Sequence, residues 1–342
     1  MWGYILLVVA ASAALMLLLM PKLLPRLRAL KLGTTIYELG PKHQQKQGTP
    51  NMGGLLIGGI TTVVTIAGAV WISIRRGTVF FSLDHRLFAL LLITLGSMGI
   101  GFADDYIKDV HHRHDGLSPK QKLALQLAVG ILFSVYCYFY VGSDILLPFT
   151  RKTWDLGVFY IPVMTVAVMF MTNSANLQDG LDGLLSTVTI LGMLAFGAMI
   201  VALQGVERVD GGTQALLLTA CLALSGSALG FLYFNRYPAK IFMGDTGSMY
   251  IGGMMIGVAM LSKCVFPMLL FCFTSIMSSL SVMLQVSYYK LTHGKRIFKM
   301  SPIHHHFELC GMTEKQIVRM YAVVTMVTSL LAIWIMSPYF KG

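Results

Sequence analysis

Long apolar segments recur along the whole chain and constrain its fold more than any other feature. The sequence has 342 residues, of which 56% are hydrophobic and only 12% are charged, whereas soluble domains carry about 25% charged residues. A helix needs roughly 20 apolar residues to cross a hydrocarbon layer, and ten segments approach that length. They cover approximately residues 2–21, 52–74, 87–103, 122–142, 157–174, 183–203, 213–234, 247–262, 265–288 and 317–337. We therefore predict an all-α polytopic membrane protein that forms one domain over residues 1–342.

The distribution of charge predicts how the chain is oriented. If both termini lie outside, the cytoplasmic loops between ten spans hold 18 of the 26 Lys and Arg residues, as the positive-inside rule requires. The same loops hold ten of the 15 acidic residues and eight of the nine histidines. Because that rule makes no demand on Asp or His, we predict a functional site on the cytoplasmic face.

Five polar stretches fall in these loops, at residues 42–54, 101–122, 173–186, 234–248 and 294–311. Loops carry function more often than they carry packing, so five polar loops on one face indicate a single site. The Gly-x-x-x-Gly pairs Gly226/Gly230 and Gly253/Gly257 instead predict close packing between helices.

Carboxylates at two predicted span ends are candidates for chemistry. Asp104 and Asp105 end the third span, where adjacent carboxylates repel each other unless a cation or proton intervenes. A solvated helix end would also explain this pair. Asp245 lies in GDTGS, where a helix cap is the ordinary explanation, but Gly244 beside it permits close approach of the backbone to a ligand. GDTGS lacks the spacing of a phosphate-binding P-loop.

A second group of polar residues precedes the sixth span, in NSANLQDGLDGL. Asp179 and Asp182 lie three residues apart, so they share one face if the segment is helical. One of them could serve only as a cap. The amides of Asn173 and Asn176 both donate and accept, so they suit the recognition of a ligand's polar edges.

Three consecutive histidines, His304, His305 and His306, stand in the last loop. Consecutive side chains point in different directions, and structural zinc sites use spaced ligands, so zinc is disfavoured. Hydrogen bonding to a sugar, a phosphate or a peptide carboxylate is the preferred interpretation, with a solvated loop as the alternative.

Carboxylates that bind Mg²⁺, together with lysines, suit a diphosphate. The net charge is +11, and basic residues flank the acidic motifs in the sequence. These residues are Lys46, Lys108, Lys120, Lys122 and Lys240. The chain is therefore expected to handle phosphate at the membrane surface, where a soluble nucleotide-linked donor can meet a lipid phosphate; no nucleic-acid partner is expected.

The motifs DDYIK, NSANLQDGLDGL, FMGDTGS and SPIHHHFE resemble those of the polyprenyl-phosphate N-acetylhexosamine-1-phosphate transferases over essentially the whole chain. SPIHHHFE with GTPNMGG is similar to the branch that uses UDP-N-acetylmuramoyl-pentapeptide. The resemblance implies transfer of phospho-N-acetylmuramoyl-pentapeptide to undecaprenyl phosphate, which yields lipid I and UMP for peptidoglycan synthesis. It also implies Mg²⁺ as cofactor, a multi-pass protein of the bacterial inner membrane, and a homodimer as one allowed assembly.

The resemblance further implies roles for individual residues. Asp104, Asp105 and Asp245 would be the catalytic carboxylates, with Asp245 as a metal ligand and Asp105 as a candidate second ligand. The implied substrate-binding residues are Asn173, Asn176, Asp179 and Asp182 on the nucleoside side, Phe242 with Lys46 and Asn235 around the uracil, His304, His305, His306 and Gln285 around the sugar and peptide, and Gly244, Lys108 and Lys120. The chain departs from the family pattern at Gln178 and Asn51, where Thr is more frequent, and at His111 and His112, where Lys is.

Two questions stay open at this stage. The lipid phosphate could attack the β-phosphorus directly, which we favour because a phosphate is a competent nucleophile at neutral pH, or an aspartate could first form a phospho-enzyme. The rival functions are transfer of N-acetylglucosamine-1-phosphate, which the His loop argues against, and anion transport. Transport sites lie near the bilayer midplane, and the predicted spans carry no Asp, Glu, Lys or Arg in their middle.

Overall fold

The computed structural model describes residues 2–29, 48–76, 85–110, 116–203 and 211–340. The described chain is mainly helical, with one small hairpin. Its elements are α1 (Trp2–Ala29), α2 (Gly54–Arg76), α3 (His85–Val110), α4 (Pro119–Tyr140), β1 (Asp144–Leu146), β2 (Thr153–Asp155), the 3₁₀ helix η3 (Gly157–Phe159), α5 (Tyr160–Gln178), α6 (Leu184–Ala202), α7 (Gly211–Asn235), α8 (Gly244–Leu261), α9 (Val265–Phe271), α10 (Phe273–Leu291), α11 (Ile303–Leu309), α12 (Glu314–Ile335) and the 3₁₀ helix η4 (Ser337–Phe340).

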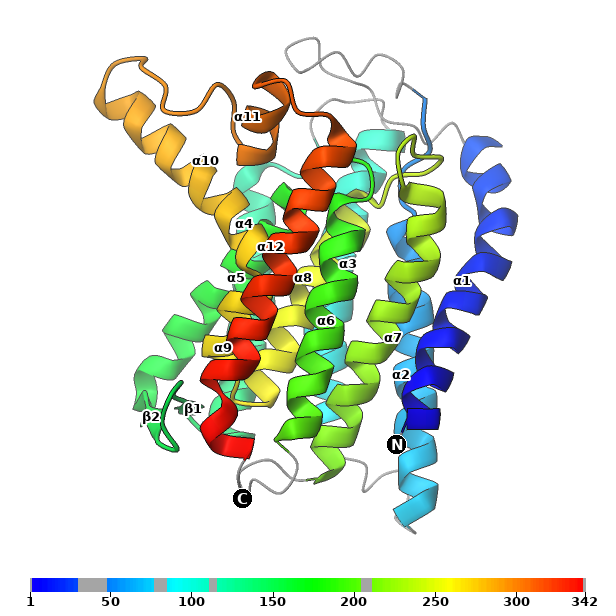
Figure 1. Ribbon diagram of the computed structural model, residues 1–342, viewed down its shortest axis with the longest axis vertical. Helices are drawn as coiled ribbons and strands as arrows, with labels where there is room; N and C mark the ends of the chain where they lie inside the picture. The colour runs from blue at the N-terminus through cyan, green and yellow to red at the C-terminus, as the bar shows by residue number, and fades with distance from the viewer. Residues whose placement is uncertain (1, 30–47, 77–84, 111–115, 204–210, 341–342) are drawn as a thin grey trace.

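The long helices run side by side between two ends of the molecule (Figure 1). Both termini lie at the end that carries the antiparallel β1–β2 hairpin, and α11 lies at the opposite end. In the described residues, eight helices are long and apolar enough to cross a membrane, or nine if the bent pair α9 and α10 forms one span. The prediction of a polytopic helical membrane protein is confirmed, whereas the predicted ten spans are found as eight or nine.

The prediction of one continuous helix over residues 265–288 is wrong. The chain breaks at Cys272, and the axes of α9 and α10 meet at 83°. Neither Pro nor Gly lies at the break, so the sequence carries no local signal for it. Side-chain contacts after the break hold α10 in its direction: Ser275 donates to the side chain of Gln178, which donates to Thr274 at 2.9 Å.

The centre of the bundle is formed by α7 and α8. Every residue of α8 from Thr246 to Leu261 is buried, although its polar first turn keeps it outside the set of eight apolar helices. The short eighth predicted span is thus an interior helix, and residues 262–264 join it to α9.

Small residues allow the central helices to approach closely, as the two glycine pairs predicted. A Cβ on Gly226 or Gly230 of α7 would strike the backbone of α1, and one on Gly253 of α8 would strike α3. In a membrane, where lipid is as apolar as the helices, such close packing stabilises helix pairs.

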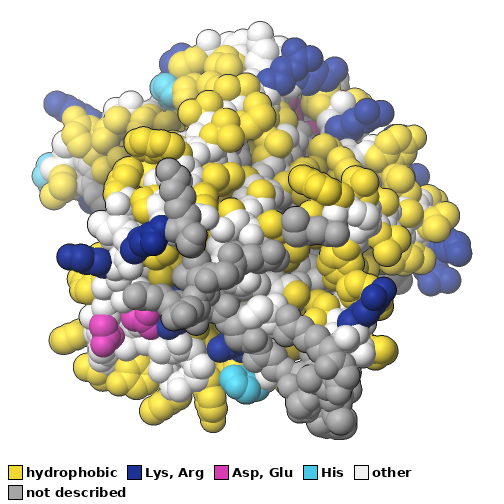
Figure 2. Space-filling model, turned by 60° about the horizontal axis from the view of Figure 1, so that its bottom comes forward, with side chains coloured by type: hydrophobic (Ala, Val, Ile, Leu, Met, Phe, Trp, Pro, Cys, Tyr) yellow, Lys and Arg dark blue, Asp and Glu magenta, His cyan; other side chains and the backbone are white. Residues whose placement is uncertain are grey.

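Figure 2 shows the molecule turned so that the end with the termini comes forward. Hydrophobic side chains cover much of the visible surface, and acidic side chains are sparse there. The acidic residues of the candidate site lie toward the other end, where α3 finishes and α8 begins.

We expect Gly101→Ala to disturb both stability and the site. A Cβ at Gly101 would overlap the carbonyl group of Asp245, whereas a Cβ at Gly99 on the same helix would meet open space. Gly101→Ala should lower the thermal midpoint in detergent, because a clash with backbone costs about 1–3 kcal/mol. Gly99→Ala, the matched control, should unfold at or above the wild-type midpoint. Equal midpoints for both variants would contradict this account of α3 and α8.

Candidate active site

Helix ends bring the predicted carboxylates together. Asp104 and Asp105 lie in the last turns of α3, Asp245 in the first turn of α8, and Asn176 near the end of α5. The short chain between α3 and α4 returns at once, so that Lys122 in the first turns of α4 reaches the same point. Motifs more than a hundred residues apart in sequence therefore share one location.

Two carboxylates share two ammonium groups at this location. The Asp245 Oδ2 atom lies 2.7 Å from the Lys122 Nζ and 3.3 Å from the Lys108 Nζ. Asp104 Oδ2 lies 2.6 Å from the Lys108 Nζ and 3.7 Å from the Lys122 Nζ. Opposite charges at such distances offset the repulsion that two neighbouring carboxylates would otherwise experience.

Neutral donors fix the remaining carboxylate oxygens. Asn176 donates to Asp245 Oδ1 at 2.7 Å and to the Ser248 hydroxyl at 3.0 Å. The Leu117 amide donates to Asp104 Oδ1 at 2.8 Å. Asn176 thus contacts the predicted catalytic Asp245 directly, and its predicted contact with the nucleoside stays a prediction.

Asp105 has a different position from its neighbour. It is 1% exposed, and its carboxylate accepts from the Asp245 amide at 3.1 Å, the Thr246 amide at 2.8 Å and the Thr246 hydroxyl at 2.6 Å. Asn51 donates to it at 3.3 Å. A carboxylate at a helix start satisfies free N–H groups and favours the helix dipole. These contacts give Asp105 the role of holding α8, and its catalytic and metal-binding roles stay predictions.

The loop before α8 is held by backbone pairing with the GTPNMGG segment. The Phe242 amide donates to the Pro50 carbonyl at 2.8 Å, and the Gly53 amide donates to the Phe242 carbonyl at 2.9 Å. Gly244 has φ +74°, and a Cβ there would overlap Asp105 and Asn51. A glycine is therefore required at 244 by the turn itself. Lys46, predicted near Phe242, lies outside the described residues, as do His111 and His112.

Two of the predicted amides hold loops in place. Asn235 is 3% exposed; it donates to the Ile241 carbonyl at 3.0 Å and accepts from the Gly183 amide at 3.1 Å. Gln285 accepts from the Ile297 and Phe298 amides, both at 3.0 Å. Asn173 on α5 likewise donates to Gln126 on α4 at 3.0 Å. Substrate contacts by these residues stay predictions.

The three histidines diverge, as adjacent side chains must. His305 contacts Glu308 at 2.6 Å, and His306 accepts from the Lys299 amide at 3.1 Å. His304 is fully buried against Gly180, and neither ring nitrogen has a hydrogen-bond partner in the described residues. Burial, and then the proximity of His305, lowers the pKa of His304 to about 3. His304 is therefore neutral, and it connects the His loop to the Asp179–Asp182 segment.

The donor set suits a divalent cation that also binds substrate. In the described part of the chain, no group of three or more His, Cys, Asp or Glu side chains is arranged to hold a metal ion. Mg²⁺, however, commonly takes one or two carboxylates and completes its octahedron with water and substrate phosphates. Asp104 and Asp245 converge on the Lys108 and Lys122 ammonium groups, so cations already occupy the space between them. Asp245 therefore keeps its predicted role as the ligand, whereas Asp105 already accepts from the start of α8 and is the less accessible candidate.

Lys122 is the residue to which the sequence interpretation gave too little weight. The substrate-binding residues predicted from the sequence include Lys108 and Lys120, and Lys108 contacts both carboxylates. Lys120 is exposed and forms no ion pair with them in the described structure. Residues two apart on a helix face opposite sides, so only one of Lys120 and Lys122 could point inward. The sequence shows this spacing, but it does not show which of the two lysines faces the site.

We expect the stability of the protein to fall as pH rises from 6 to 9, in part because of Asp179. Burial, followed by the charges of Asp245, Asp105 and Asp182, raises the pKa of Asp179 to about 8. Between its ordinary pKa of about 4 and this value, the folded chain holds a proton that the unfolded chain releases, so rising pH favours unfolding. Asp179→Asn should remove this contribution. The thermal midpoint of the variant minus that of wild type should therefore be larger at pH 9 than at pH 6, by about 2 °C or more.

Asp155→Asn is the matched control for this measurement. Asp155 lies in β2, and hydrogen bonds from Ser143 and the Gly157 amide lower its pKa. It is therefore charged throughout this pH range, and its variant should follow the wild-type curve. If Asp179→Asn also follows that curve, Asp179 is not a carboxyl of raised pKa.

Comparison with known proteins places this site in a family. The sequence model for glycosyl transferase family 4 matches residues 87–263, which include Asp104, Asp105, Asn176 and Asp245. The chain is similar to proteins named phospho-N-acetylmuramoyl-pentapeptide-transferase: it is 41% identical to that of Clostridium kluyveri over 91% of this chain and 92% of the relative. It is 40% identical to that of Bacillus subtilis over 93% of each chain, and 38% identical to that of Halalkalibacterium halodurans over 97% of each. The chain therefore belongs to glycosyl transferase family 4 and, within it, to the phospho-N-acetylmuramoyl-pentapeptide-transferases.

Proposed function

We propose that the protein transfers phospho-N-acetylmuramoyl-pentapeptide from its UDP-linked donor to undecaprenyl phosphate, forming lipid I and UMP. The observation that carries the proposal is the cluster in which Asp104 and Asp245 share Lys108 and Lys122. Such a cluster offers both signs of charge to a diphosphate, and it lies where several long apolar helices end. The names of the relatives supply the identity of the transferred group.

The reaction exchanges one phosphoanhydride linkage for another. An oxygen of the lipid phosphate forms a bond to the β-phosphorus of the donor, and the bond from that phosphorus to the bridging oxygen breaks, with its electrons leaving on UMP. Positioning and charge neutralisation dominate such transfers. Lys108 and Lys122 would bind the diphosphate oxygens, and Asp104 would accept the acceptor's proton when the phosphate carries one.

Mg²⁺ is part of this proposal. Held by Asp245, the ion would offset negative charge on the diphosphate and on the departing UMP. Asn176 would keep the Asp245 carboxylate in its orientation through the 2.7 Å hydrogen bond.

We further infer that the site faces the cytoplasm of a bacterial inner membrane. The donor is soluble and the acceptor is a membrane lipid, so both can reach a site at the end of a helical bundle. The two termini lie together at the other end (Figure 1), which would place them outside. A homodimer of the chain is compatible with this orientation in the membrane.

A reconstituted reaction tests the proposal directly. Purified protein with UDP-N-acetylmuramoyl-pentapeptide, undecaprenyl phosphate and Mg²⁺ should release UMP and form lipid I, and chelation of the metal should stop both. Asp245→Asn should be folded in detergent and lose at least about a hundredfold in turnover, as removal of several kcal/mol of charge stabilisation implies. Product from UDP-N-acetylglucosamine instead would favour the sister reaction, and UMP release without the lipid acceptor would favour a phospho-enzyme.

Lys122→Gln is expected to lower kcat about ten- to a hundredfold, since a hydrogen bond to a charged group contributes about 1.5–3 kcal/mol. Lys120→Gln removes the same charge two residues away and should retain activity within about threefold of wild type, because exposed charges contribute little. The ratio of the two kcat values is the measurement. A larger loss of kcat in Lys120→Gln than in Lys122→Gln would show that Lys120, and not Lys122, contacts the phosphate.

A further inference from the structure

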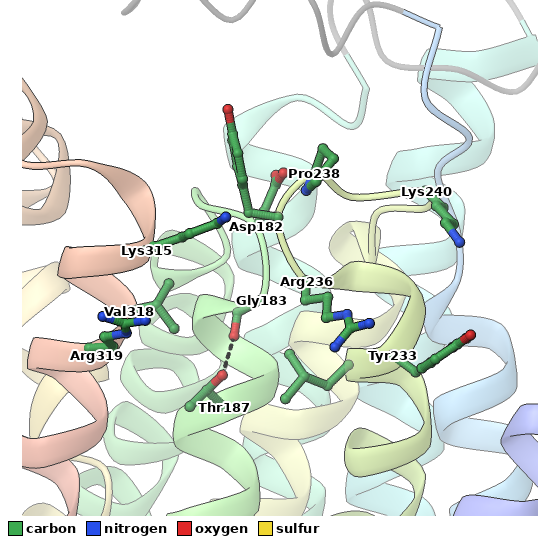
Figure 3. Close-up of a pocket in the computed structure, with 12 residues that line it drawn as sticks. Asp182, Gly183, Thr187, Tyr233, Arg236, Pro238, Lys240, Lys315, Val318 and Arg319 are labelled. Carbon is green, nitrogen blue, oxygen red and sulfur yellow. Dashed lines mark hydrogen bonds between the residues drawn. The ribbon is translucent and has the colours of Figure 1, made fainter.

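An open groove lies where α6, α7 and α12 meet at the end of the bundle that carries the site. Its volume is about 680 Å³, and it is lined by residues of three segments, 182–187, 232–240 and 315–319. Figure 3 shows Lys315 and Arg319 on the α12 side, Arg236, Lys240 and Tyr233 on the other, and Gly183 and Thr187 between them. The groove shares only Asp182 with the predicted substrate-binding residues.

The groove is strongly positive. Four exposed cations line it: Arg236, Lys240, Lys315 and Arg319. None of them forms an ion pair with an acidic side chain in the part of the chain that the structure describes. Asp182, the one acidic residue in the lining, is 5% exposed, and its carboxylate accepts from the Ala239 amide at 2.9 Å. The exposed surface of the groove therefore offers positive charge to a ligand.

Aromatic rings keep the cations over the groove. The Arg236 guanidinium lies 5.3 Å and the Lys240 ammonium 5.8 Å from the centre of the Tyr233 ring. The Lys315 ammonium lies 5.4 Å from the centre of the Tyr237 ring. These contacts restrain long side chains without neutralising them, so their charges stay available to an anion.

The position of the groove indicates a ligand from the bilayer. The three helices α6, α7 and α12 are each long and apolar enough to cross a membrane. Helices α6 and α12 begin at the groove, and α7 ends there. Tyr233 and Tyr237 are 53% and 42% exposed, and tyrosines at span ends are typical of the membrane–water interface. Leu232 and Val318 add an apolar wall beside the cations. A soluble anion would gain nothing from that wall, whereas a lipid chain would.

We propose that this groove binds the phosphate headgroup of an anionic bilayer lipid, with part of an acyl chain against Leu232 and Val318. Basic pockets between membrane helices bind such headgroups. The proposed site is separate from the Asp104–Asp245 cluster and does not depend on the reaction proposed above.

The test compares two triple variants that lose the same charge. Arg236→Gln, Lys315→Gln and Arg319→Gln together remove three groove cations, whereas Arg26→Gln, Arg75→Gln and Lys152→Gln remove three exposed cations elsewhere. Each purified protein is mixed with phosphatidylglycerol or phosphatidylcholine in detergent, and bound lipid is counted by native mass spectrometry. Wild type and the control should retain phosphatidylglycerol over phosphatidylcholine, and the groove variant should bind it at least about fivefold less, as loss of one or more interfacial cations implies.

The proposal would be overturned by equal retention of the two lipids by wild type or by equal retention of phosphatidylglycerol by the two triple variants. Displacement of that lipid by millimolar inorganic phosphate would indicate a soluble occupant and would also overturn it. Displacement by equimolar undecaprenyl phosphate would assign the groove to the substrate and also overturn it. Elution volume and helical content establish that each variant is folded. The single variant Lys315→Gln, which should weaken retention measurably, replaces the triple variant if that one fails to fold.

Discussion

Helix α8 begins inside the bundle, and the N–H groups of its first turn need hydrogen-bond acceptors there. A helix leaves its first N–H groups without partners, and within a membrane-embedded bundle such groups are costly unless protein atoms satisfy them. Asp105 meets this demand by accepting from two amides and one hydroxyl at the start of α8. Because Asp104 precedes it on α3, the cap also fixes the distance between Asp104 and Asp245. Gly101, one turn earlier, allows the two backbones to approach this closely.

The balance of charge in the cluster explains how it can be both stable and ready for a ligand. Unpaired carboxylates taken out of water are strongly disfavoured, and the ammonium groups of Lys108 and Lys122 relieve that cost. Lysine has a long, flexible side chain with three donors, so the same ammonium groups can contact a phosphate bound beside the carboxylates. Asn176 and the Leu117 amide, which carry no charge, hold the two carboxylates through hydrogen bonds that do not involve the lysines.

Several polar residues that the motifs marked as substrate contacts have a structural role in the described chain. Asn235 connects the loop before α8 to the start of α6, and Gln285 holds the backbone at residues 297 and 298. Irregular backbone at the end of a bundle has amides and carbonyls that need partners, and a side-chain amide can satisfy both kinds. The same residues can still face a substrate, but their first effect is to give the loops one shape.

The sequence alone determined the helical membrane class and singled out Asp104, Asp105 and Asp245, which the structure brings together, because hydrophobic length and motif identity are local properties of the chain. It also predicted the close helix packing at Gly226, Gly230 and Gly253. Only the tertiary structure decided that Asp105 caps α8 while Asp104 faces the lysines, that Lys122 rather than Lys120 points inward, and that the helix breaks at Cys272. Each of these depends on contacts between segments far apart in sequence, such as Gln178 with Thr274 or Asp105 with Thr246, and no local pattern specifies which side of a helix meets which partner.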